Sequence, residues 1–188
     1  MSKQSKLFPF TAALFAASLL TACDGSVRRE GPPVAELHVQ RVDAARNRLW
    51  VLEQDAVTVY DNTNGRRLRR LIVPDWVLAG PRDSCPPSLA LDASGAAFIS
   101  SNVLPVLWRV DPQRFQISQI PLALNADADK DVGFTGLAFS EDGTLHAAGA
   151  TFASMWRIDV GTGSASKVAS QGSAGACNPA LLQAAGRE

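Results

Sequence analysis

The chain has 188 residues, of which 46% are hydrophobic and 19% charged, a composition that suits one globular domain with a single core. Eighteen basic residues balance eighteen acidic ones, and no long basic run stands out. This balance argues against a nucleic-acid-binding protein and against a basic segment that binds an anionic membrane.

The N-terminus has the features of a secretory signal. Lys3 and Lys6 precede an apolar run from Leu7 to Leu20, which is too short to span a bilayer comfortably as a mature helix. The run ends in Leu20-Thr21-Ala22-Cys23, which resembles the bacterial lipobox, the element after which signal peptidase II cuts. The alternative is an ordinary secretory signal with a free cysteine nearby.

The lipobox resemblance implies that residues 1–22 are a lipoprotein signal peptide. Cys23 would then be the mature N-terminus, with a diacylglycerol on its thiol and an acylated amine, and the domain would face the periplasm from a cell membrane. Asp24 resembles the signal that retains enterobacterial lipoproteins in the inner membrane. Residues 23–33 are polar with Gly and Pro after the cysteine, which predicts a flexible tether and a folded domain over 34–188.

The folded domain is predicted to be all-β and repetitive. Leu89 to Asp111 recurs as Leu137 to Asp159, displaced by 48 residues, with a turn glycine and a Trp-Arg-[Val/Ile]-Asp ending in both copies. A looser copy begins at Leu37. Each ending is followed by a turn, such as Asn64-Gly65, and another alternating run, which predicts four strands per unit. The units are 37–75, 85–124 and 134–170, and a partial unit spans 177–188.

Units of this length with four antiparallel strands are typical of β-propeller blades. Phe134 to Gly149, FTGLAFSEDGTLHAAG, resembles the NHL, YVTN and gluconolactonase-like propeller group. The resemblance implies that the Leu-Ala strands are innermost and that Trp108 and Trp156 pack between blades. Stacking of these tryptophans on a ligand is the alternative.

Three units are too few for a closed ring, because propellers typically have four to eight blades. The last strand could cap an open array, two chains could complete one ring, or the chain could be a truncated propeller. An uncapped array exposes edge strands, so some self-association is expected.

Cys85 and Cys177 lie at corresponding repeat positions and would be the remaining thiols once Cys23 is acylated. Outside the cytosol they could form a disulfide. The alternative is two unpaired, buried thiols.

Asp127, Asp129 and Asp131 have the spacing of carboxylates in hard-cation loops and could bind Ca²⁺, although the glycine and the bidentate glutamate of an EF-hand are missing. A solvated loop is the alternative, and no other cofactor is predicted.

The sequence does not point to catalytic residues. The lactonases of the resembled group bind a metal partly through an Asn that is replaced here by Thr135, and the two histidines, His38 and His146, lie far apart in predicted strands. We therefore expect a binding or scaffolding domain with an unknown ligand. The alternatives are a lactonase-like metal-dependent hydrolase with a degenerate site, which would need Asp127, Asp131 or Glu141 to cluster with an Asn, and a truncated propeller without independent function.

Overall fold

The computed structural model describes residues 39–76, 86–125, 133–150 and 154–170. By internal contacts the chain divides into Met1–Pro32 and Pro33–Glu188, and every described residue belongs to the second unit. Within these ranges the regular structure is β apart from a 3-10 turn, η1 (Ala44–Arg46). No helix among the described residues is long and apolar enough to cross a membrane.

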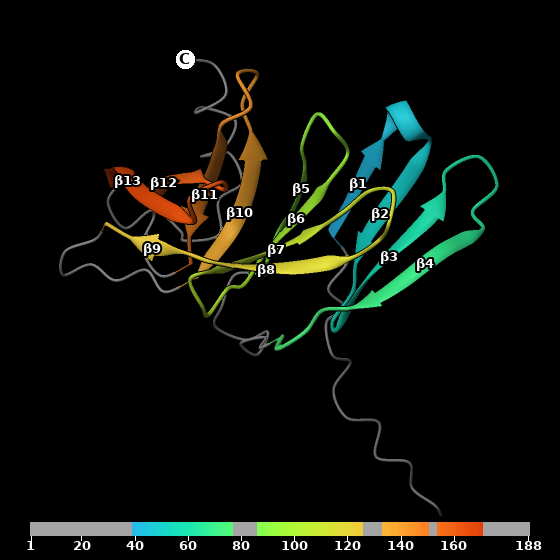
Figure 1. The fold of residues 1–188 in the computed structure, drawn as a ribbon, viewed down its shortest axis with the longest axis horizontal. Helices are drawn as coiled ribbons and strands as arrows, with labels where there is room; N and C mark the ends of the chain where they lie inside the picture. Colours follow the sequence, from blue (N-terminus) through green and yellow to red (C-terminus); the bar gives the residue numbers. More distant parts are fainter. Residues whose placement is uncertain (1–38, 77–85, 126–132, 151–153, 171–188) are drawn as a thin grey trace, which may run out of the picture. The chain divides into compact units, whose positions relative to one another are not determined.

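The strands form three antiparallel sheets, which we call blades 1, 2 and 3 (Figure 1). Blade 1 contains β1 (Val39–Asp43), β2 (Arg48–Leu52), β3 (Ala56–Asp61) and β4 (Arg67–Ile72) in sequence order. Blade 2 contains β5 (Leu89–Leu91), β6 (Ala97–Ser100), β7 (Val106–Val110) and β8 (Ile117–Pro121). Blade 3 contains β10 (Phe134–Phe139), β11 (Leu145–Gly149), β12 (Ser154–Asp159) and β13 (Ser164–Ser170). The predicted four-stranded units are confirmed.

Successive side chains of a strand point to opposite faces, and in β6 of blade 2 both faces are buried. Ile99 of β6 packs into a core shared with blade 1, whereas its neighbour Phe98 packs into a core shared with blade 3. This explains why β6 is apolar without alternation. Trp108 belongs to the first core and Trp156 to the second, and both are fully buried. The predicted packing of these tryptophans between blades is therefore confirmed.

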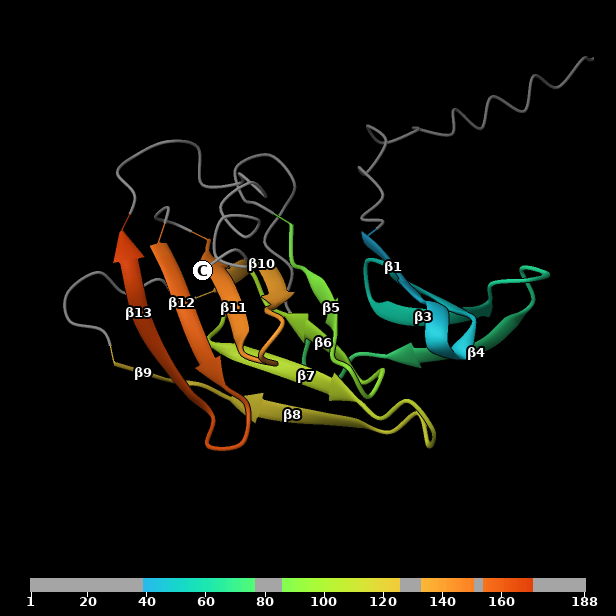
Figure 2. The same ribbon diagram turned by 90° about the horizontal axis from the view of Figure 1, so that it is seen from above.

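The first strand of each blade is the inner one. β5 contacts both β1 and β10, while the fourth strands of blades 1 and 2, β4 and β8, lie at the opposite edges of their sheets (Figures 1 and 2). One connection was not predicted: after β8 the chain forms β9 (Ala123–Leu124), which pairs in parallel with β13 of blade 3. The Ala123 amide donates to the Gly163 carbonyl at 2.7 Å, so blades 2 and 3 are joined by backbone hydrogen bonds.

The aspartate that closes the third strand of each blade shapes the next turn. Oδ1 of Asp61, Asp111 and Asp159 accepts the amide hydrogen of the residue two positions later, at 2.8 to 2.9 Å. The residue four positions later has a positive φ: Gly65 (69°), Phe115 (56°) and Gly163 (68°). Asn64-Gly65 thus marks a hairpin as predicted, but the turn is not a two-residue one, because it spans residues 62–66 and its positive φ is at Gly65.

Candidate functional site

The site residues that the sequence suggests lie outside the described residues. They are Cys23 for lipidation, Cys85 and Cys177 for a disulfide, and Asp127, Asp129 and Asp131 for calcium. These assignments stay predictions. In the part of the chain that the structure describes, no group of three or more His, Cys, Asp or Glu residues could hold a metal ion.

The positions relevant to a lactonase-like site are spread along one strand. Thr135 is the second residue of β10, whereas Glu141 is exposed in the turn after that strand. Six residues of extended chain correspond to about 20 Å. Asn102 lies at the Thr135 end, because a Cβ on the neighbouring Gly133 would stand 2.5 Å from the Asn102 carbonyl oxygen. The structure therefore does not bring Glu141 and Asn102 together.

A polar cleft of about 520 Å³ lies at the end of blade 3. Its walls come from the start of β11, the end of β12 and the start of β13; the lining residues are Gly143, Thr144, Leu145, Arg157, Ile158, Asp159, Val160, Ser164 and Ser166. A guanidinium, a carboxylate and several hydroxyls therefore meet in one hollow. Such a set can recognise a polar ligand by hydrogen bonds and charge.

Arg157 connects the cleft to one face of blade 3. Strand pairing places Arg157 opposite His146 on one side and opposite Ser166 on the other, so the three side chains form a row across the sheet. Their strand neighbours Ile158 and Ala147 point into the core shared with blade 2. The row consequently lies on the face of blade 3 that points away from blade 2.

The carboxylates near this cleft are poor general bases. Hydrogen bonds from the Ser140 hydroxyl, and then from Thr144, lower the pKa of Asp142 to about 2. Hydrogen bonds from Thr162 and from the Gly161 amide lower the pKa of Asp159. Both groups are ionised at neutral pH, where an efficient general base needs a pKa near the working pH. This environment suits ligand recognition better than proton transfer.

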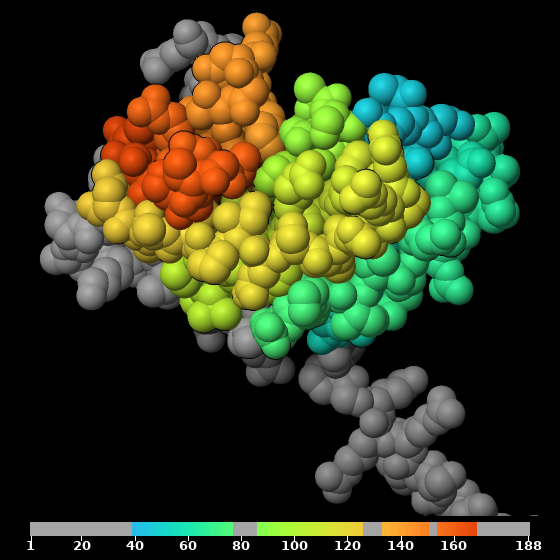
Figure 3. Space-filling model, in the orientation of Figure 1, coloured from blue at the N-terminus to red at the C-terminus, as the bar shows by residue number. Residues whose placement is uncertain are grey.

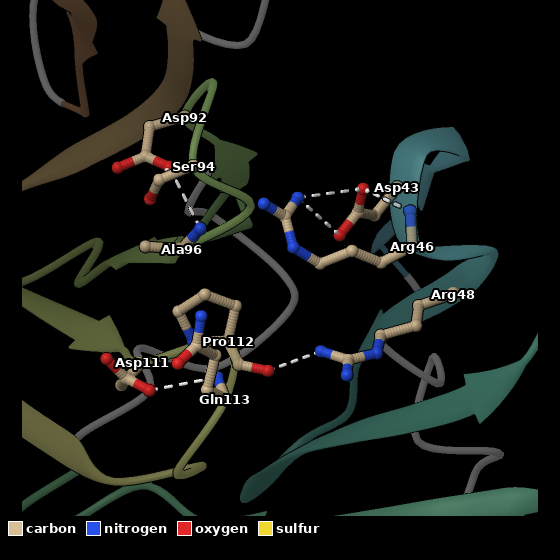
Figure 4. A network of polar contacts seen from close by, with 9 residues as sticks. All are labelled: Asp43, Arg46, Arg48, Asp92, Ser94, Ala96, Asp111, Pro112 and Gln113. Atoms are coloured by element: carbon tan, nitrogen blue, oxygen red, sulfur yellow. Dashed lines mark hydrogen bonds and ion pairs between the residues drawn. The ribbon is translucent and has the colours of Figure 1, made fainter.

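Polar contacts also occupy the junction of blades 1 and 2 (Figure 4). The buried Asp43 accepts from the Arg46 amide at 3.2 Å and from Arg46 Nη1 at 3.3 Å. Gly95 of blade 2 leaves room for this ion pair, since a Cβ there would stand 2.7 Å from Asp43 Oδ2. Arg48 donates to the Pro112 carbonyl across the same junction. These side chains are used to hold the two blades in place.

Phe115 is an aromatic residue with two guanidinium neighbours. Its ring centroid lies 5.0 Å from Arg48 Cζ and 5.7 Å from Arg69 Cζ, and its φ of 56° is unusual for a bulky side chain. The equivalent turn positions in the other blades are the glycines at 65 and 163. This cluster was not predicted from the sequence; its signal is the segment Arg66-Arg67-Leu68-Arg69-Arg70, which a net charge of zero conceals.

Within the described residues, two aromatic positions of the junctions are occupied by polar residues on the faces without a neighbouring blade, although Tyr60 shares the face of Thr58 in blade 1. In the second strands of blades 1 and 2, Trp50 and Phe98 are buried at the junctions. The structurally equivalent residue in blade 3 is His146. On the opposite face of the blades, Thr58 of β3 is at the position in blade 1 that is equivalent to Trp108 in blade 2 and Trp156 in blade 3. The Thr58 hydroxyl donates to Glu53 Oε1 at 2.8 Å. Thr58 is fully buried and His146 is half-buried, and both positions are more polar than their counterparts at the internal junctions.

No protein-family model matches the chain, and no curated protein matches it. Among solved structures it is similar to virginiamycin B lyase from Staphylococcus aureus: a catalytically inactive variant with quinupristin has 14% sequence identity and a TM-score of 0.51. The selenomethionine-substituted lyase has 13% identity and the same TM-score of 0.51. In both comparisons the match covers 74% of this chain and 42% of the lyase chain. The likeness shows a β-propeller-like fold, and the chain spans less than half the length of the proteins it matches.

Proposed function

We propose that this chain is a lipid-anchored protein of the bacterial cell envelope whose propeller-like blades form a binding or scaffolding module. The anchor is supported by Leu20-Thr21-Ala22-Cys23 and by the polar tether that follows it. Several acyl chains, each contributing roughly 0.8 kcal/mol per buried methylene, would hold such a domain at the bilayer durably.

The cleft of blade 3 is the observation that supports a binding role. Its Arg157, Asp159 and Ser166 offer a charged donor, a charged acceptor and a hydroxyl within one hollow of about 520 Å³. The nearby carboxylates have low pKa values because turn hydrogen bonds stabilise their ionised forms, so they favour recognition over acid–base chemistry. A polar ligand or a polar segment of another protein fits these groups.

A partner other than a second copy of this chain is favoured. Completing a ring with a second copy would bring Thr58 and His146 to the positions where both internal junctions have buried aromatic residues. Aromatic pairs contribute to such junctions beyond the area they bury. We therefore expect the domain to bind its partner through the cleft and to form no stable ring by itself.

The anchor and the binding role can be tested separately in intact cells. Metabolic labelling with an alkyne fatty acid should mark the wild-type chain and leave Cys23→Ser unlabelled; equal labelling of both would contradict the anchor. A photo-crosslinking residue in place of Ser166 should give a discrete adduct that Arg157→Ala weakens. The same residue in place of Ser118, exposed on β8 of blade 2, is the control. Equal crosslinking from both positions would contradict a binding site at the cleft.

A further inference from the structure

The charges of the described residues are distributed unevenly over the blades. Residues 39–76 contain seven arginines and five acidic residues, a net charge of +2. The described part of blade 3 contains one Arg and one Lys against three acidic residues, a net charge of −1. Four of the seven arginines lie within five positions, on β4 and the residue before it, and we call Arg66, Arg67, Arg69 and Arg70 the arginine edge.

All four arginines of this edge are exposed, and β4 is the outermost strand of blade 1. Arg70 is paired with Glu53 at 3.2 Å and with Asp55 at 2.8 Å. Within the described residues, Arg66, Arg67 and Arg69 make no ion pair; Arg69 donates to the Leu68 carbonyl and contacts the Phe115 ring, so the charges of Arg66 and Arg67 are the most available to a partner. Figure 3 shows the green surface of β4 next to the yellow surface of the segment that contains Phe115, whose ring contacts the Arg69 guanidinium.

Protection of a sheet edge does not by itself require four arginines. Charged side chains on edge strands do prevent edge-to-edge aggregation. However, β8 has the corresponding outer place in blade 2, and its sequence Ile-Ser-Gln-Ile-Pro contains no charge. The outer strand of blade 2 has one arginine before it, Arg114, and ends in Pro121, which also protects an edge, so the excess of arginines is specific to blade 1 and suits recognition of negative charge.

We propose that the arginine edge binds anionic phospholipid headgroups of the membrane that carries the chain, a proposal that rests on the lipid anchor proposed above. Blade 1 is the first blade after the tether of residues 24–33. The flexible tether that the sequence predicts for these residues would have an end-to-end distance of roughly 18 Å and would keep blade 1 near the bilayer surface. Anionic lipids attract arginine there strongly enough to raise the affinity about fivefold per residue.

The test uses the polypeptide from Asp24 to the C-terminus without acyl chains, because Pro33–Glu188 is a compact unit of its own. It is sedimented with vesicles of phosphatidylcholine alone or mixed with phosphatidylglycerol. The variant Arg66→Gln/Arg67→Gln removes two exposed charges from the edge. The control Arg41→Gln/Arg109→Gln removes the exposed charge of Arg41 on β1 and the half-buried charge of Arg109 on β7, so both proteins have the same net charge.

The proposal predicts binding to the phosphatidylglycerol vesicles that falls as salt is raised, is about 25-fold weaker in the edge variant, and changes less than about twofold in the control. Equal loss in both variants, or equal binding to phosphatidylcholine alone, would overturn it. So would displacement from the vesicles by an oligonucleotide at lower concentration than the lipid itself, because nucleic acid would then be the preferred partner. Fatty-acid labelling of the full chain tests the anchor independently. If the full chain is labelled but the polypeptide from Asp24 does not bind the vesicles, the result refutes the role of the arginine edge and leaves the anchor intact.

Discussion

Gly95 and Gly143 form a natural pair for testing how the blades fit together. They lie in equivalent turns, 48 residues apart, with φ values of 80° and 84°. An added Cβ at Gly143 would have nothing within 4 Å, whereas at Gly95 it would collide with the Arg46 guanidinium and stand 2.7 Å from Asp43 Oδ2. Replacing each by Ala therefore imposes the same backbone strain, and only Gly95→Ala disturbs the junction of blades 1 and 2.

The expected costs follow from these contacts. A left-handed conformation costs a residue with a Cβ about 1–2 kcal/mol, and loss of unfolded-state freedom offsets about 0.4–1 kcal/mol of this. Gly143→Ala should therefore lower the free energy of unfolding by about 1 kcal/mol. In Gly95→Ala the Arg46 side chain must move away, which leaves the Asp43 carboxylate, 5% exposed, without its charged partner. A buried acceptor that loses its partner adds about 1–3 kcal/mol.

Urea unfolding of the two variants, followed by tryptophan fluorescence, measures this difference. Gly95→Ala should be less stable than Gly143→Ala by about 1–3 kcal/mol, and in an Arg46→Ala background that difference should shrink. Thermal unfolding should show the same order, at about 2–4 °C per kcal/mol for a chain of this size. Equal stabilities of the two single variants would refute the role assigned to the ion pair at the junction.

Three further predictions concern single residues. Trp156→Ala should lower the free energy of unfolding in urea by about 3–5 kcal/mol, because the indole is fully buried between blades 2 and 3. The lowered pKa of Asp142 stabilises the fold above the unfolded pKa near 3.8, and this contribution disappears as the pH falls toward about 2. An acid titration of Asp142→Asn should consequently show a smaller loss of stability over that range than the wild type. Phe115→Gly should be more stable than Phe115→Ala by about 1–2 kcal/mol in the same assay, since both remove the ring and only Gly adopts the φ of 56° freely.

The fold was predictable because its signals are local. Alternating runs define strands, and the aspartates at 61, 111 and 159 mark the turns that follow the third strands, so four strands per unit could be predicted from the sequence. The parallel pairing of β9 with β13 was not predictable in this way. The pairing of Ala123 with Ser164 depends on how blades 2 and 3 are placed next to each other. In addition, a strand of two residues is too short to show a periodic sequence pattern.

The candidate sites were less accessible to sequence reasoning. Arg157 lies in the repeated Trp-Arg-[Val/Ile]-Asp ending, which predicts a strand and a turn but no site, and it joins His146 and Ser166 only through strand pairing. The net charge is a sum over the whole chain, so its value of zero gives no sign of the arginine edge, although the residues of the edge are close together in the sequence. The contrast with the uncharged β8 becomes informative only after the sheets show that β4 and β8 have corresponding places.

The blades, we propose, form a module held at a membrane through Cys23. Mass spectrometry of the N-terminal peptide, from protein extracted out of bacterial membranes with detergent, tests it most directly. We predict that the mature chain begins at Cys23 and that this residue carries a diacylglycerol and an acylated amine. A mature chain that begins at another residue, or a Cys23 with a free thiol, would contradict the claim.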